Sequence, residues 1–191
     1  MSPMVRLAGR ATLADDGEIT WSVADGRRGR RWRAATRRLG ALAGSLLLEV
    51  GVDGRMVRLE LATAAGLLTL HPEATASLHG NAVTANGIAH ITMAWSDDHG
   101  LELDGLPIPA AVTAGRLAAS TPVGEGRTVP VVVVGQDLSV RAAERRYTRV
   151  DDATWRIEGE GREETLAVDK RGVPVWPKAG GEWPLELDPP A

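Results

Sequence analysis

The segment from Ser45 to Thr63 constrains the fold more than any other part of the sequence. SLLLEVGV and RMVRLELAT are two extended, apolar-rich runs, and Asp53-Gly54 separates them. Asp-Gly between two such runs is typical of the tight turn of a β-hairpin. In the second run the residues alternate, so we expect Val57, Leu59 and Leu61 to share one face of the sheet.

The same strand signal recurs along the chain. EITWSVA (18–24) alternates like a half-buried strand, and VVVV (131–134) is an unbroken β-branched run typical of a strand buried on both faces. The stretch 67–100 predicts three consecutive strands, with bends at Gly80-Asn81 and Asn86-Gly87. Short strands separated by Asp, Gly and Glu follow Leu138. We therefore predict a mainly β protein: one domain over residues 1–191, built as an antiparallel curved sheet or half-barrel with one or two short helices.

Three segments are less regular. Ala34–Gly44 favours a short helix by its Ala, Leu and Arg content, although Gly40 weakens that prediction. AAVTAGRLAAS (110–120) fits either one or two helical turns or another strand. The Pro- and Gly-rich tail is expected to cover the sheet surface, with Trp176 and Trp183 as anchors.

Composition excludes several classes of protein. The 191 residues carry a net charge of -3, which gives no overall electrostatic reason to bind nucleic acid. The sequence has no cysteine, so disulfides and zinc–thiolate sites are excluded. No apolar run approaches the roughly 18 residues of a membrane span, and no signal-peptide core is visible, so we expect a cytoplasmic protein. Phosphate-binding loops and the G-x-S-x-G motif are also absent, and no cofactor is expected.

The stretch 67–100 contains all four histidines, His71, His79, His90 and His99. Their spacing matches no metal motif, so no metal site is predicted. Asp97 and Asp98 precede His99 and offer acid–base chemistry, but the composition of Ser-Asp-Asp-His-Gly favours a polar turn that caps its own backbone. His90 is the one histidine predicted to lie in the middle of a strand.

A cluster of arginines surrounds Trp32. Its members are Arg27, Arg28, Arg30, Arg31, Arg33, Arg37 and Arg38. Guanidinium groups beside an indole suit an anionic headgroup or a sugar ring. Because the whole chain is acidic, we favour a solvated hairpin rim whose arginines pair with the surplus of acidic residues.

The C-terminal part of the chain contains a set of short motifs in a fixed order. They are Arg116-Leu117, Gly124-Glu125, Leu138–Val140, RRYTRV (145–150), Trp155-Arg156 and LAVDKRGVPV (166–175), ending near Trp183. Over about the last 70 residues this order resembles the closing strands of a family described as glycolipid-binding proteins. The resemblance implies a curved antiparallel sheet around a helix or loop, similar to bacterial lipoprotein carriers.

These observations lead to one expected function and two alternatives. We expect a non-catalytic protein that holds a hydrophobic or glycolipid-like small molecule in a β-cup lined by Leu, Val, Ile and Trp. The candidate ligand-binding residues are Arg30, Arg31, Trp32, His90 and Trp95. The first alternative is a small β-cup enzyme, an isomerase, cyclase or hydrolase, that uses His90, Asp97, Asp98 or His99 as acid and base. The second is a structural or interaction protein without a cavity.

Overall fold

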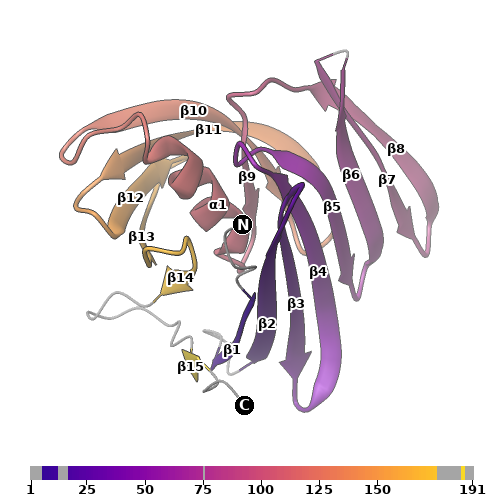
Figure 1. Ribbon diagram of the computed structural model, residues 1–191. Coiled ribbons are helices and arrows are strands. Elements are labelled where there is room, and N and C mark those ends of the chain that lie inside the picture. Colours follow the sequence, from indigo (N-terminus) through magenta and orange to yellow (C-terminus); the bar gives the residue numbers. More distant parts are fainter. Residues whose placement is uncertain (1–5, 13–16, 75, 176–185, 188–191) are drawn as a thin grey trace. The chain divides into compact units, whose positions relative to one another are not determined.

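The computed structural model describes residues 6–12, 17–74, 76–175 and 186–187 (Figure 1). The chain forms two compact units, each with its own β-sheet. Among the described residues, the first contains 6–12, 17–74, 76–96, 136–138 and 186–187, and the second contains 97–135 and 139–175. The predicted anchors Trp176 and Trp183 lie outside the described residues.

The first unit is a nine-stranded antiparallel sheet. Its strands lie in the order β15-β1-β2-β3-β4-β5-β6-β7-β8. Their bounds are β1 Arg6–Thr12, β2 Glu18–Gly26, β3 Gly29–Arg38, β4 Ala41–Gly51, β5 Met56–Thr63, β6 Gly66–Glu73, β7 Ser77–Thr84, β8 Gly87–Ala94 and β15 Glu186–Leu187. From β1 to β8 each strand pairs with the next along the chain, so the predicted antiparallel sheet is confirmed.

The two faces of this sheet differ in burial. In β2, Ile19, Trp21 and Val23 are buried while Thr20 and Ser22 are exposed, as the alternation predicts. The buried face continues through Leu, Val and Trp side chains of the neighbouring strands. We call the opposite face, which carries Thr20 and Ser22, the outward face.

The hairpin of β4 and β5 is confirmed, but one of its residues points the other way. Glu49 pairs with Arg58 and Val50 pairs with Met56, so Val57 is an extra residue between two pairs. Such a β-bulge shifts the side-chain alternation by one position. Met56 is consequently buried, and Val57, expected to share a face with Leu59 and Leu61, is 51% exposed.

The predicted short helix over Ala34–Gly44 is wrong. These residues form the end of β3, a turn and the start of β4, with Arg38 opposite Ala41. Leu39 and Gly40 adopt positive φ angles of 50° and 78° in the turn. Cross-strand pairing therefore overrides the helix propensity of the Ala- and Leu-rich sequence, as tertiary context often does.

The stretch 67–100 contains the three predicted strands, β6, β7 and β8, but one of its bends is misplaced. Gly80 and Asn81 lie in the middle of β7, opposite Leu70 and Thr69. The glycine is needed for close strand packing, because a Cβ on Gly80 would lie 2.0 Å from the Thr69 carbonyl oxygen. The turn between β7 and β8, which ends at Gly87, is confirmed.

The second unit is a six-stranded sheet that curls around one helix, and together they form a half-barrel (Figure 1). The order is β14-β13-β12-β11-β10-β9. The elements are β9 Gly100–Leu103, α1 Ile108–Leu117, β10 Gly126–Val134, β11 Val140–Arg149, β12 Thr154–Gly159, β13 Arg162–Val168 and β14 Pro174–Val175. The segment 110–120, for which helix and strand were both open, is thus mostly helical.

The helix fills the interior of the half-barrel. Ala111, Ala114 and Leu117 pack with side chains of the curled sheet, among them Tyr147 and Trp155. The strand 131–134 is buried on both faces, as predicted. Strands β9 and β10 are parallel, in contrast to the other pairs. A parallel pair needs a long crossover, and α1 supplies it.

Candidate functional site

A groove of about 540 Å³ lies on the outward face of the nine-stranded sheet. Strands β2 to β6 contribute its lining. The lining residues are Thr20, Trp21, Ser22, Arg33, Ala34, Ala35, Ser45, Leu46, Leu47, Glu60, Ala62 and Leu67. The volume lies within the roughly 300–1,000 Å³ of small-molecule sites.

The register of the strands explains why a hollow exists at this place. Thr20, Ala35, Ser45, Ala62 and Leu67 lie directly opposite one another across five strands. We call these five the small-residue row. Three of its members, Ala35, Ser45 and Ala62, have very small side chains. Little side-chain volume therefore covers the backbone at this place. Leu67 closes one end with an apolar side chain.

A second row runs beside the first and is more polar. Ser22, Arg33, Leu47 and Glu60 are cross-strand neighbours on the same face. Glu60 forms an ion pair with Arg58. No ion pair or hydrogen bond joins the Arg33 guanidinium to another described residue. The groove therefore combines a floor of mostly small side chains with the Arg33 guanidinium at its side.

Two arginines of the cluster, Arg30 and Arg31, which were expected to bind a ligand, form ion pairs within the protein. Arg30 forms an ion pair with Asp25, with 2.6 Å between Nε and Oδ1, and Arg31 pairs with Glu49. Trp32 is fully buried, and its ring lies at a tilt to that of Trp21 with 5.9 Å between the ring centroids, so its indole is not exposed for stacking on a ligand. The groove-lining arginine is Arg33, which belongs to the same cluster.

His90 and Trp95, the other two expected ligand-binding residues, lie outside the groove lining. The His90 Nδ1 lies 2.6 Å from the Asn81 Oδ1 on the neighbouring strand, where it forms a hydrogen bond on the outward face. Trp95 follows β8 and is buried, and its backbone N–H donates to the Ala76 carbonyl.

The Asp97–His99 segment forms a turn in the second unit. The backbone carbonyls of all three residues accept hydrogen bonds from Arg116, at 2.9 to 3.1 Å. The Asp98 carboxylate also pairs with Arg127 at 3.1 Å. These contacts are those of the polar-turn interpretation, in which the segment holds a loop against the last turn of α1.

Two further histidines face each other in the first unit. His71 and His79 are cross-strand partners, and the Nε2 atoms of both lie 3.6 Å from carboxylate oxygens of Glu73. Across the described ranges no set of three or more His, Cys, Asp or Glu side chains has a geometry able to hold a metal ion.

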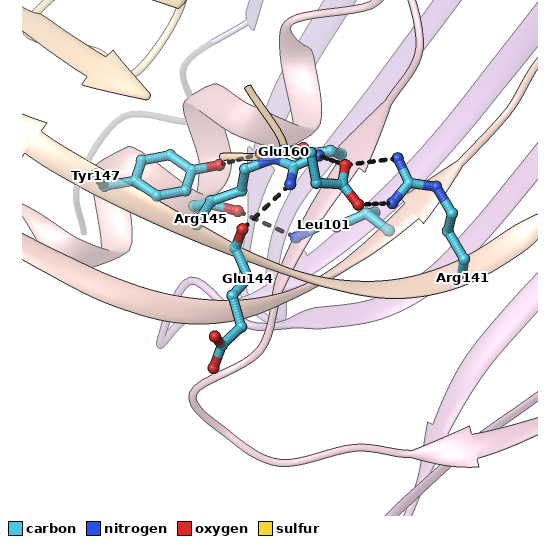
Figure 2. Close-up of polar contacts among 8 residues, drawn as sticks. Leu101, Arg141, Glu144, Arg145, Tyr147 and Glu160 are labelled. Carbon is cyan, nitrogen blue, oxygen red and sulfur yellow. Dashed lines mark hydrogen bonds and ion pairs between the residues drawn. The ribbon is translucent and has the colours of Figure 1, made fainter. Parts of the chain in front are cut away.

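The second unit contains a buried polar network that sequence reasoning missed (Figure 2). Arg145 donates through Nε to Glu102 at 3.0 Å and through a terminal nitrogen to Glu160 at 2.8 Å. The Tyr147 hydroxyl donates to the other oxygen of Glu102 at 3.2 Å. Arg141 donates hydrogen bonds to the Glu160 carboxylate through both terminal nitrogens, as Figure 2 shows. The sequence shows that Arg145 and Tyr147, two positions apart on one strand, share a face. It carries no local sign of their partner Glu102, which lies 43 positions before Arg145.

Burial raises two pKa values in this network, and hydrogen bonds lower a third. Desolvation raises the pKa of the Glu102 carboxyl, although Arg145 and Tyr147 act against the rise. Burial also raises the pKa of Tyr147 well above its ordinary value, and the neighbouring Glu102 adds to that rise. At the exposed end, hydrogen bonds from Arg141 and Arg145 lower the pKa of Glu160. The contacts join β9, β11 and the turn between β12 and β13, and we assign the network a structural role.

The described part of the chain contains no helix long and apolar enough to cross a membrane.

Together these features define a β-protein of the curved-sheet and half-barrel class with an open groove on its larger sheet. No family model and no curated protein matches the sequence. A similar fold occurs in the crystal structure of a DUF1089 family protein from Pseudomonas aeruginosa, with a TM-score of 0.55 and 15% sequence identity. The alignment covers 93% of this chain and 91% of that chain, so the likeness shows a common fold.

Proposed function

We propose that this protein is a non-catalytic binding protein for a hydrophobic or glycolipid-like small molecule, held in the groove over β2–β6. The observation that carries the proposal is the 540 Å³ hollow above the small-residue row. An apolar chain laid along Ala35, Ser45 and Ala62 would cover backbone and methyl groups that are otherwise open to water. Burial of apolar area at about 25 cal/mol per Å² is the driving force for such binding.

The polar row gives the ligand an orientation. Arg33 offers a guanidinium at the side of the groove, with the Ser22 hydroxyl on the neighbouring strand. A planar guanidinium forms paired hydrogen bonds with carboxylate, phosphate or sugar oxygens. The expected ligand is thus an amphiphile with its tail on the small-residue row and its headgroup at Arg33. The cytoplasm is the proposed setting of this binding.

The first test asks whether the protein retains such a molecule. Native mass spectrometry of the purified protein should show a co-purifying amphiphile, and a fluorescent fatty acid should bind when that molecule is removed. Ala62→Leu, which fills the floor, should weaken fatty-acid binding by at least about tenfold, equivalent to 1.4 kcal/mol. Val83→Leu extends a side chain in the same register outside the groove lining and is the matched control.

Two results would count against the proposal. One is a purified protein that carries no amphiphile and binds no fatty-acid probe. The other is equal loss of probe binding in Ala62→Leu and Val83→Leu, which would place the probe elsewhere on the sheet.

A further inference from the structure

The nine-stranded sheet ends in an edge strand with an unusual composition. β8, Gly87–Ala94, has the sequence GIAHITMA and pairs with β7 on one side. Among the described residues no strand pairs with its other side. All eight residues are exposed or half-buried, and Ile88 is 64% exposed.

This strand lacks the features by which proteins protect an edge. Natural edge strands are commonly shortened, bulged, or supplied with charged residues and proline, because their free N–H and C=O groups template pairing with another chain. β8 has eight residues without Lys, Arg, Asp, Glu or Pro, and its pairing with β7 runs without a register shift. The N–H and C=O groups on the outer side of β8 can therefore form hydrogen bonds with a further strand.

We propose that β8 pairs antiparallel with β8 of a second copy of this chain, about a two-fold axis at Ile91. Antiparallel pairing of a strand with itself is isologous, so one patch supplies both halves of the interface. With no charged side chain on the strand, the self-pair brings no like charges opposite one another, which would be unfavourable in a ladder.

The choice of register follows from the side chains. A two-fold axis perpendicular to the sheet keeps each face of β8 on the same side in both copies. With the axis at Ile91, that residue opposes its own copy and Ala89 opposes Met93, so one face is wholly aliphatic. On the other face His90 opposes Thr92 and Ile88 opposes Ala94. An axis at His90 would instead place two imidazoles against each other.

The absence of native cysteine makes a direct test possible. Directly opposed Cα atoms in an antiparallel pair lie about 4.5–5.5 Å apart, which matches the separation in disulfides. Ile91→Cys should therefore form a covalent dimer under mild oxidation. Val57→Cys carries an exposed thiol on an interior strand and is the matched control, and Met93→Cys is a second control because its own copy would lie four positions away along the ladder.

Analytical ultracentrifugation of the cysteine-free protein provides the second measurement. The dimer fraction should rise with concentration up to about 1 mM, the weak end of measurable association. Thr92→Lys introduces a charge at the edge and should lower that fraction at least tenfold, whereas Val57→Lys should not. A protein that stays monomeric at every concentration, or cross-linking of Ile91→Cys no faster than of Val57→Cys, would overturn the proposal. Circular dichroism identifies any variant that fails to fold.

Discussion

Replacement of Arg145 by Met tests whether the buried network stabilises the half-barrel. The Arg145 side chain is 8% exposed and that of its partner Glu102 is 16% exposed, so both charges are largely removed from water. Met keeps most of the aliphatic volume but removes the guanidinium. Glu102 would then be a buried carboxylate with Tyr147 as its remaining hydrogen-bond donor in the network.

The expected cost follows from the two arms of Arg145. Loss of one partner of a buried ion pair costs about 3–5 kcal/mol, because the other charge stays buried without compensation. The arm to Glu160 adds little, because that carboxylate is 45% exposed and water screens its charge. Protonation of Glu102, whose pKa burial already raises, limits the loss. We therefore expect Arg145→Met to lower the free energy of unfolding by about 3 kcal/mol.

Urea unfolding at neutral pH measures this change as a shift of midpoint at constant slope. Two comparison variants sharpen the result. Arg141→Met removes the exposed end of the same network and should cost less than about 1 kcal/mol. Arg145→Met combined with Glu102→Leu removes both buried charges and should recover most of the loss, apart from about 1 kcal/mol for the Tyr147 hydroxyl. If Arg145→Met costs no more than Arg141→Met, or if the double variant is no better than the single, the explanation given for the network is wrong.

Three further predictions concern the same fold. The raised pKa of Glu102 means that the native state binds this proton more tightly than the unfolded chain. Its contribution to stability is therefore complete below the unfolded value and is lost as pH rises through the folded pKa. Glu102→Gln should remove this slope from the stability–pH curve, and Glu160, whose pKa is lowered, should contribute the opposite slope. Thr113→Val removes a buried hydroxyl that accepts a backbone N–H of β9, and should lower the thermal midpoint by the equivalent of about 1–3 kcal/mol; an unchanged midpoint would contradict this. Gly80→Ala should destabilise because its Cβ would lie 2.0 Å from a carbonyl oxygen, whereas Gly115→Ala, in open space on α1, should stabilise by about 0.5–1 kcal/mol. Equal midpoints for the two alanine variants in urea would refute the packing argument.

Much of the fold could be predicted where local signals and tertiary structure agree. The Asp53-Gly54 hairpin, the alternation of β2 and the buried run 131–134 are examples. Each depends on nearest-neighbour turn chemistry or on a side-chain period of two, which any single strand displays.

The candidate site was predicted less well. The sequence indicated the arginine cluster as a possible binding feature, and one of its members, Arg33 on β3, lines the groove. The small-residue row could not be predicted, because Ala35, Ser45 and Ala62 are common residue types that lie far apart in the sequence. Only the register of three different strands places them side by side.

The sequence by itself determined that this chain forms antiparallel strands, because alternation and turn residues act over a few positions. Tertiary structure decided which residues meet. Cross-strand pairing makes the helix-prone segment 34–44 part of two strands. The bulge at Val57 buries Met56 and exposes Val57, the reverse of the simple alternation. Tertiary structure also joined Glu102 to Arg145, 43 positions away, in a buried ion pair. Such contacts depend on sheet register and curvature, which are set by the packing of many strands together and leave no local mark in the sequence.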